Sequence, residues 1–280
     1  MENDPVNDAS VIEIRDIKEI SELRAVEDLQ KEVWGCNDRE ILPSLALIPL
    51  LEIGGVLLGA FAGDEMVGFV LGLPGHEGGR PILHSDMLAV KAAYRSQGLG
   101  YKLKLHQRER ALGKGIDRIT WTFDPLQSRN AYLNFAKLGV KADGYKTDYY
   151  GETSSFLHST GTDRLWVTWE LETERVKERL ELGPNYRGPQ RLSEVRTLVR
   201  IGENNAPIRS EYRGAPISAI EIPVGIDSLV ETDAALARRW RRATRLAFTS
   251  AIEAGLVVED FFRLERKGVP VGLYLLNKKS

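Results

Sequence analysis

The stretch from Ile82 to Tyr101 constrains the fold most, because it predicts a strand, a tight glycine loop and a helix in immediate succession. Alternate residues from Ile82 to Val90 would point to one face of the strand. Gly98 and Gly100 carry no Cβ atom at the point where the backbone must turn sharply and could approach a ligand closely. The helix that begins near Tyr101 would present main-chain N–H groups and the positive end of its dipole to this loop. Such a loop is suited to binding a pyrophosphate.

The residues of this stretch also resemble a known motif. Leu88-Ala89-Val90, followed after four residues by Arg95-Ser96-Gln97-Gly98-Leu99-Gly100, is similar to the acyl-CoA motif Arg/Gln-x-x-Gly-x-Gly/Ala of the GNAT superfamily of N-acyltransferases. The stretch lacks the third glycine of a Rossmann fingerprint and the Gly-Lys-Ser/Thr of a Walker loop. The resemblance covers roughly residues 11–171. It implies a twisted mixed sheet flanked by helices, and acetyl-CoA or another acyl-CoA as co-substrate.

Hydrophobic periodicity predicts a mixed α/β chain, in the element order that the GNAT resemblance implies. The expected strands are 11–17, 56–62, 66–73, the central strand, 116–123, 140–150 and 165–171; the expected helices are 20–34, 43–53, 101–114 and 128–138, the last with Ser128 as its N-cap.

Beyond this region the sequence predicts a second, smaller α+β domain. We predict a disordered N-terminus at 1–10, a GNAT-like domain at 11–171, a helix and linker at 172–192 and the second domain at 193–280. Within the last segment we expect strands at 195–201, 217–224, 256–265 and 269–276 and a helix at 232–254. This segment contains no recognisable chemical motif.

Composition narrows the function and the setting. Lys+Arg 38 against Asp+Glu 40 gives a net charge of −2, which favours neither nucleic acid nor an anionic membrane. Five arginines crowd residues 238–245, but we expect them to form a solvated helix face. The single cysteine, Cys36, excludes an internal disulfide and supplies no metal cluster. The N-terminus does not have the pattern of a signal peptide, so we expect a cytoplasmic protein. We also expect no metal, no membrane span and no nucleic-acid partner.

His84 and Asp86 are the predicted general base. They lie two residues apart, on one face of the expected strand, roughly 7 Å from each other. A histidine titrates near neutrality, which suits deprotonation of an amine. Asp86 would need a raised pKa or a water chain, or would orient His84 instead. In the GNAT resemblance these positions carry the base, often through an ordered water; the alternative is an interior histidine beside a capping carboxylate.

The resemblance also assigns the residues that would bind CoA. Leu88, Ala89 and Val90 would bind the pantetheine, and a strand bulge there would aim a main-chain N–H at the thioester oxygen. Main-chain N–H groups from Gln97 to Tyr101, across Gly98, Leu99 and Gly100, would bind the pyrophosphate, with Arg95 and Ser96 beside them.

The helix at 128–138 departs from the family pattern. The resemblance implies a CoA-contacting asparagine at the position of Ser128; in this chain Asn130 lies nearby. It also implies a proton-donating tyrosine at the position of Phe135. Phenylalanine has no proton to donate to the leaving thiolate. Tyr132, one turn earlier, could replace it, as could Tyr149 or Tyr150; the alternative for Tyr132 is ordinary packing.

These observations predict an acyltransferase that moves an acetyl or other short acyl group from acyl-CoA directly to an amine. The alternative is a non-catalytic CoA-binding protein, which the phenylalanine at position 135 favours and the pair His84 and Asp86 opposes. A third reading, a nucleic-acid-associated protein, is opposed by the balanced charge. We expect a small-molecule or peptide amine as acceptor, and nothing in the sequence chooses among small amines, amino acids, peptides and protein lysines. The second domain would pack on the first, cover the acceptor site or form a homodimer.

Overall fold

The computed structural model describes residues 12–153, 155, 159–183, 195–266 and 268–279. The chain divides into two compact units, residues 1–116 and 117–280, which we call the N-terminal and C-terminal units. Both combine strands with helices, so the predicted mixed α/β class is confirmed. The segment 1–10, predicted to be disordered, lies outside the described residues. The domain boundary placed at 172–192 stays a prediction.

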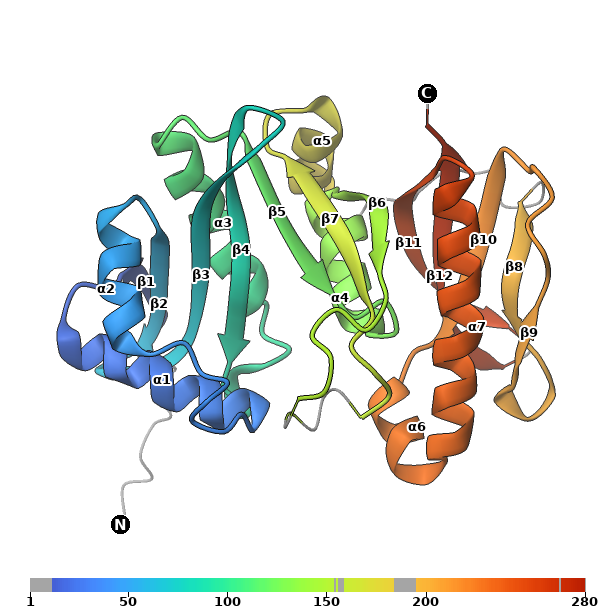
Figure 1. Cartoon of the computed structure of the whole chain (residues 1–280), viewed down its shortest axis with the longest axis horizontal. Coiled ribbons are helices and arrows are strands. Elements are labelled where there is room, and N and C mark those ends of the chain that lie inside the picture. Colours follow the sequence, from blue (N-terminus) through green and yellow to red (C-terminus); the bar gives the residue numbers. More distant parts are fainter. Residues whose placement is uncertain (1–11, 154, 156–158, 184–194, 267, 280) are drawn as a thin grey trace, which may run out of the picture. The chain divides into compact units, whose positions relative to one another are not determined.

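The N-terminal unit is a four-strand antiparallel arrangement in the order β1-β2-β3-β4. Helices α1 and α2 cover one face of these strands, and α3 lies on the other face (Figure 1). The elements are β1 (Ile12–Asp16), α1 (Ile20–Trp34), α2 (Ser44–Glu52), β2 (Val56–Ala62), β3 (Glu65–Glu77), β4 (Arg80–Val90), the 3-10 turn η1 (Ala92–Tyr94) and α3 (Leu99–Gly113).

Helix α1 shows why the local pattern was sufficient here. Its apolar residues recur at helical spacing and are buried, and Gly35 ends the helix with φ 65°, a left-handed conformation that favours glycine. Glu22 completes a capping box with Glu19 at the first turn. The buried face packs against β2, β3 and β4 in a cluster that includes Phe69 and Leu71.

The C-terminal unit contains strands in the order β5-β7-β6-β11-β12-β10-β8-β9. Its recorded pairs are antiparallel except β8 with β10, which run parallel. The elements are β5 (Arg118–Phe123), α4 (Ser128–Ala131), the π-helical turn η2 (Tyr132–Leu138), β6 (Lys141–Lys146), β7 (Arg164–Glu170), α5 (Glu174–Leu182), β8 (Arg196–Ile201), η6 (Glu203–Asn205), β9 (Pro207–Arg209), β10 (Ile217–Pro223), α6 (Ile226–Thr232), α7 (Ala234–Glu253), β11 (Leu256–Arg266) and β12 (Val269–Lys278).

Helix α7 combines a buried apolar face with buried arginines. Trp240 and Phe248 are fully buried, and the Phe248 ring packs on Tyr274 of β12 at 5.1 Å between ring centroids. Arg241 is 3% exposed and binds both carboxylate oxygens of Asp124, at 2.8 and 2.6 Å. Arg245 binds Asp163 at 2.6 Å. The expectation that the arginines of this helix form a solvated face is therefore wrong for Arg241, which is buried, whereas Arg245 is 31% exposed. The local pattern does not reveal the acidic partners of either residue, because they lie far away in the sequence.

Several element boundaries differ from the sequence prediction. The strand expected at 140–150 ends at Lys146, where a turn begins. Helix α6 and the short strand β9 were not predicted. Ser128 is the first helical residue of α4 rather than its N-cap, which is Gln127. Within the described residues, no helix is both long and apolar enough to cross a membrane.

Candidate functional site

The predicted phosphate loop lies between β4 and α3 in the N-terminal unit. Gly98 is the N-cap of α3 with φ 79°, and an added Cβ there would meet no atom within 4 Å. Ser96 also has a positive φ, 67°. The first helical hydrogen bond runs from the Lys102 N–H to the Gly98 carbonyl oxygen at 3.0 Å. The loop is thus a turn with two residues of positive φ that leads into the N-terminus of α3, with open space at the Cβ position of Gly98. A helix N-terminus presents main-chain N–H groups that can bind an anion.

Arg95 ties this loop to the end of β4. Its Nε donates to the carbonyl oxygen of Val90 at 3.0 Å, and its main-chain N–H donates to that of Ala92 at 3.2 Å. The side chains from Arg95 to Gln97 are exposed, whereas Leu99 is buried and anchors the start of the helix. The guanidinium is therefore held beside the loop by the strand that precedes it.

The strand bulge lies earlier in β4 than expected. Leu88, Ala89 and Val90 pair in regular register with Val70, Phe69 and Gly68 of β3. The register shifts instead where Ser85 and Asp86 of β4 both oppose Gly72. The bulge expected at 88–90 is thus wrong in position, because the pairing with β3, rather than the β4 sequence, decides where the extra residue fits.

His84 and Asp86 flank Ser85 at this bulge, so strict side-chain alternation does not hold between them. His84 pairs with Leu73, on the sheet face that packs against α1 and α2, and is half-buried. Burial lowers the pKa of His84 and outweighs the opposite effect of Asp86. Asp86 is exposed, but the surrounding protein still reduces the hydration of its carboxylate and thereby raises its pKa. His84 opposes this shift. The structure therefore brings the two groups close enough to affect each other, with the imidazole neutral at pH 7.

Two buried residues beside this pair were not predicted. Lys104 of α3 donates from Nζ to the Oγ of Ser85 at 2.7 Å, and both residues are 4% exposed. The sequence shows only that a lysine stands on the apolar face of this helix. It does not show whether that lysine is buried or solvated.

The predicted site residues of the helix after β5 belong to the C-terminal unit. Ser128 is buried and Asn130 is exposed. Phe135 is fully buried, with ring centroids 6.1 Å from Phe123 and 5.7 Å from Tyr274. The half-buried Tyr132 ring lies under the guanidinium of Arg263, 4.6 Å from its centroid. Tyr132 therefore points along a different direction from Phe135, towards β11.

The alternative tyrosines, Tyr149 and Tyr150, are 43% and 46% exposed. The Tyr150 hydroxyl lies 3.4 Å from the Thr122 Oγ1 on β5. The guanidinium of Arg164 lies 5.0 Å from the Tyr150 ring centroid. Tyr150 is therefore the tyrosine of this pair whose hydroxyl reaches β5, the first strand in the order of the unit.

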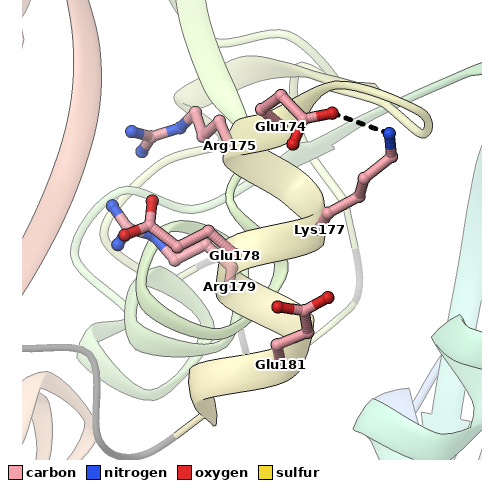
Figure 2. A pocket seen from close by; sticks show the side chains of 6 residues that line it. All are labelled: Glu174, Arg175, Lys177, Glu178, Arg179 and Glu181. Atoms are coloured by element: carbon pink, nitrogen blue, oxygen red, sulfur yellow. Dashed lines mark hydrogen bonds and ion pairs between the residues drawn. The ribbon is translucent and has the colours of Figure 1, made fainter.

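Two surface hollows lie elsewhere, in the C-terminal unit. One, of about 510 Å³, is lined by six charged side chains of α5 (Figure 2). The other, of about 400 Å³, is lined by Arg238, Arg241, Arg242, Arg245 and Leu246 of α7. Neither includes a predicted site residue, and each is walled by a single helix. Over the described ranges, no group of three or more His, Cys, Asp or Glu side chains is arranged to hold a metal ion.

Comparison with known proteins gives one family match. Residues 23–139 match the model of the acetyltransferase (GNAT) family. No curated protein matches the chain. Similar solved structures include the ribosomal-protein-S18-alanine N-acetyltransferase from Escherichia coli, 15% identical over 58% of this chain and 96% of that chain, with a TM-score of 0.45. A GNAT family acetyltransferase from Elizabethkingia anophelis with acetyl-CoA bound is 19% identical over 57% of this chain and 98% of that chain, with a TM-score of 0.42.

Proposed function

We propose that this protein, whose residues 23–139 match the acetyltransferase (GNAT) family model, transfers an acetyl or other short acyl group from acyl-CoA to an amine. The observation that carries the proposal is the loop from Arg95 to Gly100, a left-handed glycine turn that opens α3 directly after β4. Its main-chain N–H groups and the helix dipole would bind the CoA pyrophosphate. Leu88, Ala89 and Val90, in regular register on β4, would bind the pantetheine.

His84 would act as the base. Burial keeps the imidazole neutral at pH 7, so it can take a proton from the acceptor ammonium, directly or through a water. Asp86 would stabilise the imidazolium that forms. The free amine nitrogen would then attack the thioester carbonyl carbon, and a main-chain N–H of β4 would bind the developing oxyanion.

The collapse of that intermediate breaks the C–S bond, and the leaving thiolate needs a proton. Tyr132 is the proposed donor. The Tyr132→Phe variant should then show a lower kcat with unchanged acyl-CoA affinity. Equal kcat values for variant and wild type would remove Tyr132 from the mechanism and leave Tyr150 as the tyrosine to test.

Direct transfer is favoured over a covalent acyl-enzyme. Cys36 is the single cysteine of the chain, and burial, with Glu40, raises its pKa, so the thiol stays protonated near neutrality. A protonated, partly buried thiol is a weak nucleophile. Attack by the acceptor amine on bound acyl-CoA therefore needs no protein nucleophile.

The first test is acetyl-CoA binding, measured by calorimetry on the wild type and on Gly98→Glu. Glutamate at position 98 would place a carboxylate in the space that the phosphates need, and should abolish binding. Gly79→Glu is a matched control, because Gly79 has the same φ of 79° and the same open surroundings but lies in the β3–β4 turn. Equal loss in both variants would point to backbone strain, and no binding by the wild type would refute the proposal.

A further inference from the structure

Helix α3 presents two polar side chains to the interior of the N-terminal unit. Lys104 is 4% exposed and Gln107 is fully buried. They are three residues apart, so they lie on one face of the helix. This is the buried face, which also includes Leu103. Lysine and glutamine are rarely buried to this extent, and each needs a polar partner when it is.

Lys104 contacts the bulge of β4, and Gln107 lies beside Gly72, the β3 residue opposite that bulge. Lys104 Nζ donates to Ser85 Oγ at 2.7 Å, and Ser85 is one of the two β4 residues that oppose Gly72. A Cβ on Gly72 would lie 2.7 Å from the Leu83 side chain and 3.0 Å from Gln107 Nε2. The bulge, Gly72 and the two polar residues of α3 are therefore packed as one cluster, which has no room for another side chain.

Burial of the polar groups in this cluster costs free energy. Burial lowers the pKa of Lys104 to about 7, since the ammonium loses its hydration. Neither polar atom of the Gln107 amide has a hydrogen-bond partner within the described part of the chain. An unsatisfied buried amide costs about 1–3 kcal/mol. An apolar interior would be more stable, which points to a functional reason for the polar residues.

We propose that Lys104, acting through Ser85, is a positioning residue that holds the β4 bulge and thereby fixes the side chains of His84 and Asp86. A bulge re-aims the side chains beside it and disrupts the local ladder, so its geometry needs support from a neighbouring element. The bond from α3 to Ser85 supplies that support between the two proposed acid–base residues. The catalytic part of this inference rests on the proposed function, whereas the link to His84 does not.

Lys104 also acts on His84 through its charge. Burial lowers the pKa of His84, Asp86 and Glu77 raise it, and Lys104 lowers it further. Because the Lys104 pKa is about 7, the ammonium is formed in the pH range where His84 gains its proton. Removal of the lysine charge should therefore raise the His84 pKa.

The test is Lys104→Met, which keeps the length of the side chain and removes the amino group. Proton NMR titration of the imidazole signals, with the His84 signal identified by its loss in His84→Gln, should show a higher midpoint for His84 in this variant. In a transferase assay, kcat/KM should fall by up to about 100-fold, with its acid limb moved to higher pH and acetyl-CoA affinity unchanged.

Two controls separate positioning from packing. Lys114→Met removes an exposed lysine from the end of the same helix and should leave the His84 midpoint unchanged. Gln107→Leu alters the same α3–β4 interface but leaves the bond to Ser85, and should also leave that midpoint unchanged. If Lys104→Met does not fold, Ser85→Ala carries the test, since it removes only the hydroxyl that Lys104 contacts.

An unchanged His84 midpoint in both Lys104→Met and Ser85→Ala would overturn the inference, as would an equal shift in Gln107→Leu. The titration needs no turnover. A wild type without transferase activity would therefore refute the proposed function, while the His84 midpoints still decide whether Lys104 controls this histidine.

Discussion

The buried ion pair between Arg179 of α5 and Asp260 of β11 gives a sharp prediction for the C-terminal unit. Arg179 Nη2 lies 2.5 Å from Asp260 Oδ1, and the two side chains are 1% and 7% exposed. Arg175 reaches the same oxygen at 3.2 Å. Burial raises the pKa of Asp260 in spite of these two arginines. The attraction of the two arginines therefore does not fully offset the hydration that the Asp260 carboxylate loses on burial. Removal of either partner of the pair would leave the other as an uncompensated buried charge.

Asp260→Asn removes the negative charge and leaves the Arg179 cation buried. Loss of one partner of a buried pair costs about 3–5 kcal/mol. The Glu174–Lys177 pair on the same helix is the matched control, with an N–O distance of 2.7 Å but side chains 90% and 50% exposed (Figure 2). Glu174→Gln should cost less than about 0.5 kcal/mol, because solvent screens an exposed pair. Burial, rather than distance, separates the two expectations.

The assay is urea unfolding at pH 7 followed by tryptophan fluorescence. Trp34 lies in the N-terminal unit and the other four of the five tryptophans lie in the C-terminal unit, so the signal reports mainly on the latter. The double variant Arg179→Met with Asp260→Leu removes both of the most deeply buried charges. It leaves Arg175, which is 22% exposed and still donates to the Gly139 carbonyl oxygen, and should recover most of the loss. An Asp260→Asn loss below about 1 kcal/mol, or a double variant as unstable as the single one, would refute the reasoning.

Two further predictions concern the first helix and the aromatic cluster. Arg15 holds the pKa of Glu22 at about 2, below its ordinary 4.5, so the stability that Glu22 contributes is present above pH 4.5 and is lost as the pH falls towards 2. Glu22→Gln should therefore destabilise the N-terminal unit by about 1 kcal/mol at pH 7. The difference in the free energy of unfolding between variant and wild type should shrink below pH 4.5, and a difference independent of pH would contradict this. Phe135→Tyr should lower the melting temperature, because a buried hydroxyl without a partner costs about 1–3 kcal/mol, and should not raise kcat; a stable variant with higher kcat would show that the position can still hold the acid.

Local sequence patterns predicted those elements whose ends are set locally. Helix α1 has the predicted bounds because its apolar spacing, capping box and final glycine all lie within the helix or next to it. The glycine turn before α3 was likewise predictable, since Gly98 is needed for its own left-handed backbone, whereas phosphate binding by this turn stays a prediction. Its helix begins at Leu99, two residues earlier than expected.

Features that depend on a distant partner were not predictable. The bulge of β4 is placed at Ser85 and Asp86 by Gly72, a residue of another strand. The hydrogen bond from Lys104 to Ser85 joins α3 to β4, so no local pattern in either element predicts it. In the same way, the local pattern predicts a solvated Arg241, because its partner Asp124 lies 117 residues away in the sequence. A cytoplasmic location and a homodimer stay predictions.

The C-terminal strands offer a physical reason for the phenylalanine at position 135. Strand β11 pairs with β6, and β12 brings Tyr274 against the Phe135 ring. The Tyr274 hydroxyl already donates to the Pro125 carbonyl oxygen at 2.7 Å, and burial raises its pKa well above the usual value. It is therefore a structural phenol rather than a proton donor. A tyrosine at position 135 would place a second hydroxyl in this closed cluster, so in the proposed transferase the proton for the leaving thiolate would have to come from another residue. That requirement favours a tyrosine whose ring lies outside the cluster, and Tyr132, under Arg263, is such a residue.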